Sequence, residues 1–284
     1  MTPNPPPTDR LPFVIDACGQ FPPEAVGVDF EPYARPSTPQ LEALIAEEWG
    51  RQVALAKGTD RMLFNGELLR YVRHAIENGP AGDRFHLTVG PTCFRDFVGT
   101  NLYNRHRLDE FGWHRFANPI GTTATLLTRD GRICYGRRST RVVYHAGHVH
   151  TFGGSLEAGD RKADGTIDAF ASVARELTEE LGLRTDETRG LVCVGLIRDK
   201  EIHQPELLFE ARLGFSADEV RSRWQTAEAK DEHDEIVTLD NQPEAIVPFI
   251  RSCRPIAPVA VGALFIHGLL SWGREWFESA AAKI

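Results

Sequence analysis

An amphipathic segment between residues 167 and 181 constrains the fold more than any other part of the chain. Its apolar residues follow one another at intervals of three and four positions: Ile167, Phe170, Ala174, Leu177 and Leu181. This spacing places them in one stripe along a helix, and such a stripe is buried against another layer of the protein. Gly182 follows directly, and glycine commonly ends a helix because it accepts a left-handed backbone conformation. The sequence therefore predicts a helix that packs on one side and carries polar residues on the other.

Three glutamates, Glu176, Glu179 and Glu180, cluster on the polar side of this helix near its C-terminus. A solvated acidic face is the ordinary explanation of such a run. However, the helix dipole disfavours negative charge at this end, and like charges four residues apart repel by a few tenths of a kcal/mol. A divalent cation would remove the repulsion, and Mg²⁺ prefers oxygen ligands such as carboxylates. The helix alone leaves both interpretations open, with the glutamates exposed to solvent or to a metal.

For residues 116–284, the sequence pattern predicts a mixed α/β domain. Asp130 and Gly131 form a hairpin turn pair between two apolar runs. Ser216 is a suitable N-cap for a helix to residue 224, and Pro258 begins a final helix. Further strands are predicted at 149–152, where Gly153-Gly154 end the strand, and at 191–197, 207–213 and 236–239.

Residues 11–115 predict a small α/β extension before this domain, with the boundary between residues 115 and 118. Thr38 caps a helix that runs to about residue 56. Strands are predicted at 11–15, 25–30, 62–71 and 84–89, although 68–77 also fits a helix. Residues 1–10, MTPNPPPTDR, are rich in proline and lack an apolar core, so we expect a disordered tail.

The glycine pair and the helix together resemble the Nudix box. Its second half, from Arg175 to Leu183 (RELTEELGL), matches the family motif at every fixed position. The first half departs from the motif twice. Asp160 stands where the motif has a glutamate, and 14 residues rather than seven separate it from Arg175. The extra residues lie in the polar stretch RKADGTI, so we interpret them as a longer loop before the helix.

This resemblance implies a Nudix α/β/α sandwich with a mixed sheet, preceded by a small α+β domain. It implies an enzyme in which the glutamate trio and Asp160 bind Mg²⁺, or Mn²⁺ in its place. Arg175 would orient a glutamate through a paired hydrogen bond, and Gly153 and Gly154 would let the backbone turn tightly beside the site. Nudix enzymes often place another acid on a late loop, as a ligand or general base; here the candidate is Glu232, although a solvated turn also explains it.

Four further segments resemble the Nudix proteins that hydrolyse UDP-glucose and UDP-galactose: LFNGELLR, TCFRDFVGTN, ANPIGTTATLLTRDGRICYGRRS and VGLIRD. The implied reaction converts a UDP-hexose to UMP and hexose 1-phosphate. Asn65, Thr100 and Asn101 would then form a polar wall near the nucleotide, whereas Phe94 and Phe97 are expected in the core. Alternatives are hydrolysis of another nucleoside diphosphate derivative, such as ADP-ribose, or a catalytically inactive nucleotide-binding protein.

Arg137 and Arg138 follow the second strand of the predicted hairpin. Successive side chains of a strand point to opposite faces, so only one of the two can face a phosphate at the site. His145, His148 and His150 raise the alternative of zinc. No cysteine or second histidine cluster accompanies them, so a surface or substrate-facing role is favoured.

The composition limits which classes of binding partner and which cellular location we expect. The chain has 284 residues, a formal net charge of -8 and a pI near 5.7. This balance argues against nucleic acid, because phosphate-backbone binding requires a basic face. The longest apolar run, 259–270, is too short to span a membrane and contains His267. Five scattered cysteines without a CxxC pair favour reduced thiols and a cytoplasmic location. The oligomeric state, monomer or homodimer, is left open.

Overall fold

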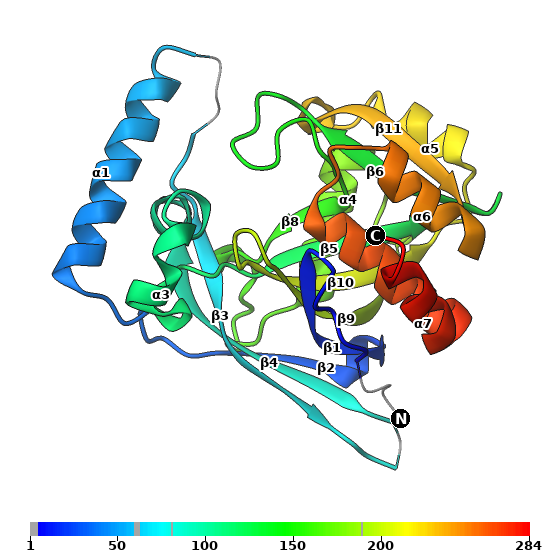
Figure 1. The fold of residues 1–284 in the computed structure, drawn as a ribbon, viewed down its shortest axis with the longest axis horizontal. Helices are drawn as coiled ribbons and strands as arrows, with labels where there is room; N and C mark the ends of the chain where they lie inside the picture. The colour runs from blue at the N-terminus through cyan, green and yellow to red at the C-terminus, as the bar shows by residue number, and fades with distance from the viewer. Residues whose placement is uncertain (1–4, 60–62, 81, 189) are drawn as a thin grey trace.

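The larger of two β-sheets forms the centre of the protein in this computed structural model, which describes residues 5–59, 63–80, 82–188 and 190–284 (Figure 1). The order of its main strands is β1-β9-β10-β5-β6-β11, while β7 pairs with β6 and β8 pairs with β5. The β5–β10 pair is parallel and the others are antiparallel, so the sheet is mixed. The strands are β1 (Phe13–Phe21), β5 (Gly121–Leu127), β6 (Arg132–Arg138), β7 (Val149–His150), β8 (Phe152–Ser155), β9 (Val192–Asp199), β10 (Pro205–Arg212) and β11 (His233–Asp240).

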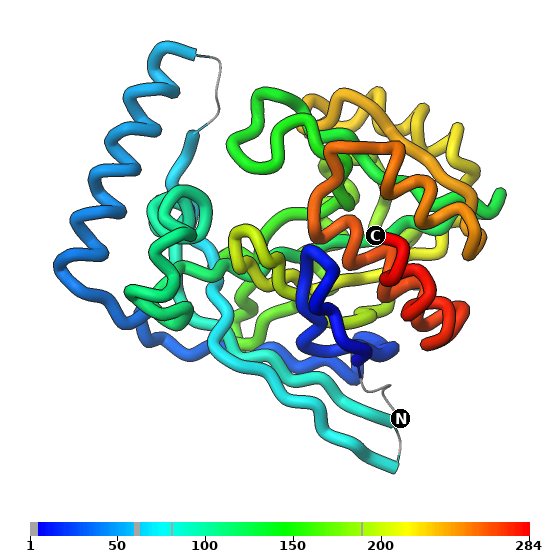
Figure 2. The backbone as a smooth tube through the Cα atoms, viewed as in Figure 1, coloured from blue at the N-terminus to red at the C-terminus, as the bar shows by residue number. Residues whose placement is uncertain are grey.

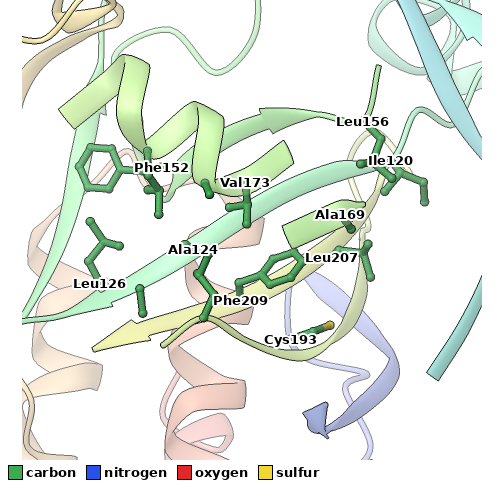
Figure 3. Packing of buried hydrophobic residues seen from close by; sticks show 14 of the residues in the cluster. Ile120, Ala124, Leu126, Phe152, Leu156, Ala169, Val173, Cys193, Leu207 and Phe209 are labelled. Carbon is green, nitrogen blue, oxygen red and sulfur yellow. The ribbon is translucent and has the colours of Figure 1, made fainter. Parts of the chain in front are cut away.

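Helices cover both faces of this sheet. On one face, α4 (Ala169–Leu181) and α5 (Ala217–Trp224) pack through Val173, Leu177 and Val220. Figure 3 shows Val173 of α4 above Ala124 and Phe209 of the sheet. On the other face lie α6 (Pro243–Ser252) and α7 (Pro258–Ala281), which share a second buried cluster with the sheet. The expected α/β/α sandwich with a mixed sheet is therefore confirmed.

Strands β5 and β6 diverge after their hairpin. They pair only near the turn, at Leu126–Cys134 and Leu127–Ile133. Farther along, β5 pairs with β8 and β6 pairs with β7. The chain thus inserts two short strands where β5 and β6 separate, and a cavity lies beside them.

A second sheet, in the order β2-β4-β3, lies in the N-terminal part. Figure 2 shows the β3–β4 hairpin projecting away from the large sheet. β1 pairs with β9, and the Leu69 amide donates to the Leu156 carbonyl, so this part is joined to the large sheet. The domain boundary near residue 115 stays a prediction. The elements are β2 (Val26–Phe30), α1 (Pro39–Ala56), β3 (Glu67–Glu77), β4 (Arg84–Cys93), α2 (Phe94–Phe97), a π-helical turn (Val98–Leu102) and α3 (Leu108–Phe111).

Several local predictions agree with the structure. Thr38 and Ser216 cap α1 and α5, because their side chains accept the amides of Leu41 and Glu219. α4 ends at Gly182, whose φ of 65° is left-handed. The apolar stripe of α4 is buried apart from Phe170, which is only partly so.

Other predictions need correction. Residues 68–77 form strand β3, so the helical alternative is wrong. Gly153 and Gly154 lie within β8 instead of ending a strand, because they pair with Thr123 and Thr122 of β5. α6 was not predicted at all. Residues 1–4 of the predicted tail and residue 62 of the predicted strand lie outside the described residues. Within the predicted tail, the carbonyl of Thr8 accepts a hydrogen bond from Lys200. No helix among the described residues is long and apolar enough to cross a membrane.

Packing of α4 on the sheet provides a test of this architecture. Leu177 is fully buried between helix and sheet. We expect Leu177→Ala to lower the free energy of unfolding by about 2–5 kcal/mol, because it leaves a cavity in the core. Leu55→Ala is the control, since Leu55 is 48% exposed and its loss should change stability by less than about 0.5 kcal/mol. Urea unfolding measures both; equal effects would contradict the assigned packing.

Candidate active site

A cavity of about 310 Å³ opens where β5 and β6 diverge. Its walls come from the large sheet, from α4 and from the N-terminal part of the chain. Four carboxylates line it: Glu157, Glu176, Glu206 and Glu232. The other polar lining residues are Thr122, Thr123, Arg138, Tyr144, His150, Ser155 and Gln204, and the remaining ones are Leu68, Phe94, Phe97, Val142, Val143, Gly153 and Gly154. The cavity therefore joins an acidic region with an aromatic wall.

Glu176 reaches the cavity across Gly154 of β8. A Cβ atom at Gly154 would lie 2.6 Å from the carboxyl carbon of Glu176, so only glycine leaves room for this side chain as it lies. Burial raises the pKa of Glu176 to about 7, with nearby Glu179 and Glu232 adding to the effect and Arg175 opposing it. The guanidinium of Arg175 lies 2.7 Å from the Glu176 carboxylate.

Glu180 is almost wholly buried, although we expected an exposed side chain. Only 1% of the residue is accessible, because it points to the sheet, where the Gly153 amide donates to its Oε2 at 2.8 Å. Burial raises the pKa of Glu180 well above its ordinary value, and the charges of Glu232 and Glu176 add to this. His233 lies 3.8 Å from Oε1, but burial lowers its pKa to about 3, so it is neutral and gives no compensating charge. Oε1 has no hydrogen-bond partner.

Asp160 remains beside α4 despite the lengthened loop. Its carboxylate lies 3.5 Å from Arg175 and accepts the Glu157 amide. The inserted residues close on themselves, since Arg161 pairs with Ile167 across an isolated bridge and the Lys162 amide donates to Thr166. The insertion is thus a local hairpin that leaves Asp160 in contact with the arginine of the motif.

The acidic residues suit a hard divalent cation. Their donors are carboxylate oxygens, the ligands that Mg²⁺ and Mn²⁺ prefer. Glu180 Oε1 has no hydrogen-bond partner. Burial, and after it the charges of neighbouring carboxylates, raises the pKa values of Glu157, Glu176 and Glu180, so a bound cation would stabilise their charged forms. In the described part of the chain no three acidic, histidine or cysteine side chains converge in a ready-made metal geometry. Arg175 lies 2.7 Å from the Glu176 carboxylate and 3.7 Å from that of Glu179.

The predicted substrate residues divide into two groups. Gly153, Gly154 and Arg138 line the cavity, and so does Glu232, the candidate for a further metal ligand or general base. Arg137 points away and pairs with Glu235, as strand alternation requires.

The other predicted substrate residues have structural contacts. Asn65 is exposed and accepts the Arg95 amide. Thr100 and Asn101 are fully buried. The Asn101 amide group donates to Asn118 and to the Ile202 carbonyl, so it joins the N-terminal part to the large sheet. The structure does not bring these three residues to the cavity.

Several lining residues were not singled out from the sequence. Phe97 is buried in a hydrophobic cluster against which Phe94 packs, as expected for the core, and both also line the cavity. Glu157 lies three positions before Asp160, where the family motif gave no reason to select it. Nothing in the sequence indicated that Gln204 and Glu206 line a cavity, because polar residues near the start of a strand are common.

The three histidines do not assemble a zinc site. His150 alone of them lines the cavity, and burial lowers its pKa well below the ordinary value. His145 lies 3.6 Å from Asp199, and its ring is 5.0 Å from that of His148.

The fold and cavity define an α/β/α protein that presents a glutamate-bearing helix to the opening of a split sheet. No protein-family model matches the chain. It is 25% identical to Nudix hydrolase 9 of Arabidopsis thaliana over 231 residues, 71% of this chain and 72% of that protein. The similarity extends over more than two thirds of each protein.

Two solved structures are also similar in part. A Nudix family protein from Listeria innocua is 16% identical, with 52% of this chain and 90% of that chain covered and a TM-score of 0.35. A MutT Nudix hydrolase from Burkholderia pseudomallei is 19% identical, with 51% and 95% covered and a TM-score of 0.30.

The raised pKa of Glu176 predicts a pH-dependent cost to stability in the metal-free protein. Because the folded state holds the proton more tightly than the unfolded state, stability falls as the pH rises from about 4.5 to about 7. Glu176→Gln removes this cost, and each tenfold difference in proton affinity between the two states corresponds to at most about 1.4 kcal/mol. We therefore expect the variant to be more stable than wild type at pH 8 and similar to it at pH 4.

Chemical denaturation with EDTA present measures this difference. Glu228→Gln is the control, because Glu228 is exposed and does not line the cavity. A difference between Glu176→Gln and wild type that stays constant from pH 4 to pH 8 would show that the carboxyl is not desolvated as described.

Proposed function

We propose that this protein is a metal-dependent Nudix hydrolase that cleaves the diphosphate bond of a nucleotide sugar. The favoured substrate is UDP-glucose or UDP-galactose, which with one water gives UMP and hexose 1-phosphate. The observation that carries the proposal is the acidic cluster of α4 beside a cavity large enough for a small ligand, with Glu180 fixed to the Gly153 amide. The similarity to Nudix hydrolase 9 supports the reaction class.

Glu176, Glu179 and Glu180 would hold Mg²⁺ or Mn²⁺, with Asp160 and Glu157 as further carboxylates close to Arg175. The cation supplies charge neutralisation at the diphosphate and makes a water more acidic. Among the residues of the chain, Arg175 orients Glu176 through the 2.7 Å contact. Arg138 offers a positive charge to the phosphates. Glu232 also lines the cavity and is the candidate to accept the proton of the attacking water.

A second candidate function is binding of a nucleotide without turnover. The departures from the motif at Asp160 and in the inserted hairpin favour it. The retained glutamate trio favours catalysis. Hydrolysis of ADP-ribose in place of a UDP-hexose would keep the reaction class and change the substrate.

A product assay across UDP-glucose, UDP-galactose, ADP-ribose and a dinucleoside polyphosphate, each with Mg²⁺, separates these functions. We expect UMP from the UDP-hexoses and none after addition of EDTA. Cleavage of another nucleotide alone would overturn the substrate assignment. Binding measured by calorimetry without any phosphate product would favour the inactive alternative.

Glu180→Gln tests the acidic cluster. The change preserves shape and the contact with Gly153 but removes the charge. Loss of outer partners of a metal site costs about 10–100-fold, so we expect loss of a direct ligand to lower kcat by about 100-fold or more. Circular dichroism should show an unchanged fold.

The matched control is Glu187→Gln. Glu187 follows α4 and pairs with Arg223 outside the cavity, so this variant should keep its kcat. Near-normal turnover in Glu180→Gln would contradict the assignment of the trio.

A further inference from the structure

The cavity has a second polar region that the acidic cluster does not use. It is built around Gln204 and Glu206, which are 3% and 4% exposed. Glu206 stands at the start of β10, two positions after Gln204, so the two side chains can face the same side. Both line the cavity, Glu206 from β10 and Gln204 from the loop just before it, and neither belongs to the glutamate motif.

Polar atoms in this region lack partners within the protein. Gln204 Oε1 is buried without a hydrogen bond, and so are Thr122 Oγ1, His150 Nε2 and the hydroxyl of Tyr144. All four residues line the same cavity. A buried polar atom left without a partner is unfavourable, because it has lost its hydrogen bonds to water. Four such atoms around one cavity indicate a ligand that supplies several hydrogen bonds.

The carboxyl of Glu206 lies directly against the backbone of a glycine on the neighbouring strand. A Cβ atom at Gly121 of β5 would lie 1.7 Å from Glu206 Oε2, so glycine leaves room for this carboxyl as it lies. Burial raises the pKa of Glu206 well above its ordinary value, the charge of Asp199 adds to this, and Arg138 opposes it. The protonated form is thereby favoured, and a protonated carboxyl offers one donor and one acceptor side by side.

An aromatic wall lies across the same cavity. The ring of Phe97 is 6.1 Å from that of Phe94 and 6.0 Å from that of Tyr144. Aromatic faces and a few placed polar groups are the usual surroundings of a planar ligand ring. Arg138 lowers the pKa of both Glu180 and Glu206, so its charge acts on both regions of the cavity.

We propose that this region is the nucleobase subsite, in which Glu206 and Gln204 bind the hydrogen-bonding edge of uracil. The proposal rests on the proposed function, since a nucleotide that spans the cavity would place its phosphates near Arg138 and its base beyond it. The imide edge of uracil carries an N–H next to a carbonyl. A carboxyl or a carboxamide can bind this pair of groups with two hydrogen bonds. The aromatic wall suits the face of the ring better than it suits a hexose.

The subsite is tested by measuring how UMP and glucose 1-phosphate, the two products of the proposed reaction, bind to wild type and to variants of Glu206. Calorimetry measures the Kd of UMP and of glucose 1-phosphate for wild type, Glu206→Leu and Glu206→Gln, with Mg²⁺ present. We expect Glu206→Leu to weaken UMP binding about tenfold or more and to leave glucose 1-phosphate within about threefold, since one or two ligand hydrogen bonds are lost. Glu206→Gln should stay within about threefold of wild type for UMP, because its amide keeps one donor and one acceptor.

Glu48→Leu is the matched control, because Glu48 is 5% exposed, lies on α1 and does not line the cavity. It should bind UMP like wild type. If Glu206→Leu does not fold, Gln204→Met replaces it, with the same expected loss of UMP affinity. Loss of glucose 1-phosphate binding with UMP binding unchanged would overturn the proposal and assign the region to the hexose.

The test also separates this proposal from the proposed function. Binding of UMP is measured without turnover. If UMP binding is weakened by Glu206→Leu but the wild type hydrolyses no nucleotide sugar, the proposed function is wrong and the subsite proposal stands. If the wild type hydrolyses a nucleotide sugar but Glu206→Leu leaves UMP binding unchanged, only the subsite proposal is wrong.

Discussion

The hydrogen bond from the Gly153 amide to the buried Glu180 carboxylate is the contact on which the arrangement of the site depends. It joins the last turns of α4 to β8 at a distance of 2.8 Å. Gly153 adopts a φ of 143°, and a Cβ atom there would lie 2.0 Å from the Thr122 carbonyl oxygen, so no other residue fits this strand as it pairs. The apolar stripe of the helix holds α4 on the sheet, while this bond fixes where its carboxylates point.

The cost of this arrangement is concentrated negative charge. Glu176 and Glu180 are desolvated and close to Glu232, and Arg175 compensates only part of the charge. A protein evolves such a cluster at the expense of stability when the charge is needed for chemistry, and perturbed carboxyl groups are therefore frequent at functional sites. The same cavity contains a second desolvated carboxyl, Glu206, on a different strand. Its surroundings favour hydrogen bonding to a neutral ligand ring instead of metal binding.

Local chemistry made much of the fold predictable from the sequence. Thr38, Ser216 and Gly182 are capping residues whose effect extends over a few positions, and the structure has each helix boundary where they predict it. The glutamates of α4 were also recognisable, because their spacing belongs to one helix. Burial was harder to predict. Asn101 looked like a ligand residue, but its amide binds Asn118 and Ile202, which is 101 positions away. Glu206 was missed because its significance comes from its position over Gly121 of a neighbouring strand.

The most direct test of this account is titration of Mn²⁺ into the purified protein, followed by electron paramagnetic resonance of the free ion. The account predicts that wild type removes free Mn²⁺ from solution with a saturable site and that Glu176→Gln and Glu180→Gln each weaken this binding about tenfold or more, because each removes a charged oxygen ligand. Glu187→Gln should bind like wild type. Equal Mn²⁺ binding by wild type, Glu176→Gln and Glu180→Gln would contradict the claim that the carboxylates of α4 form a metal site.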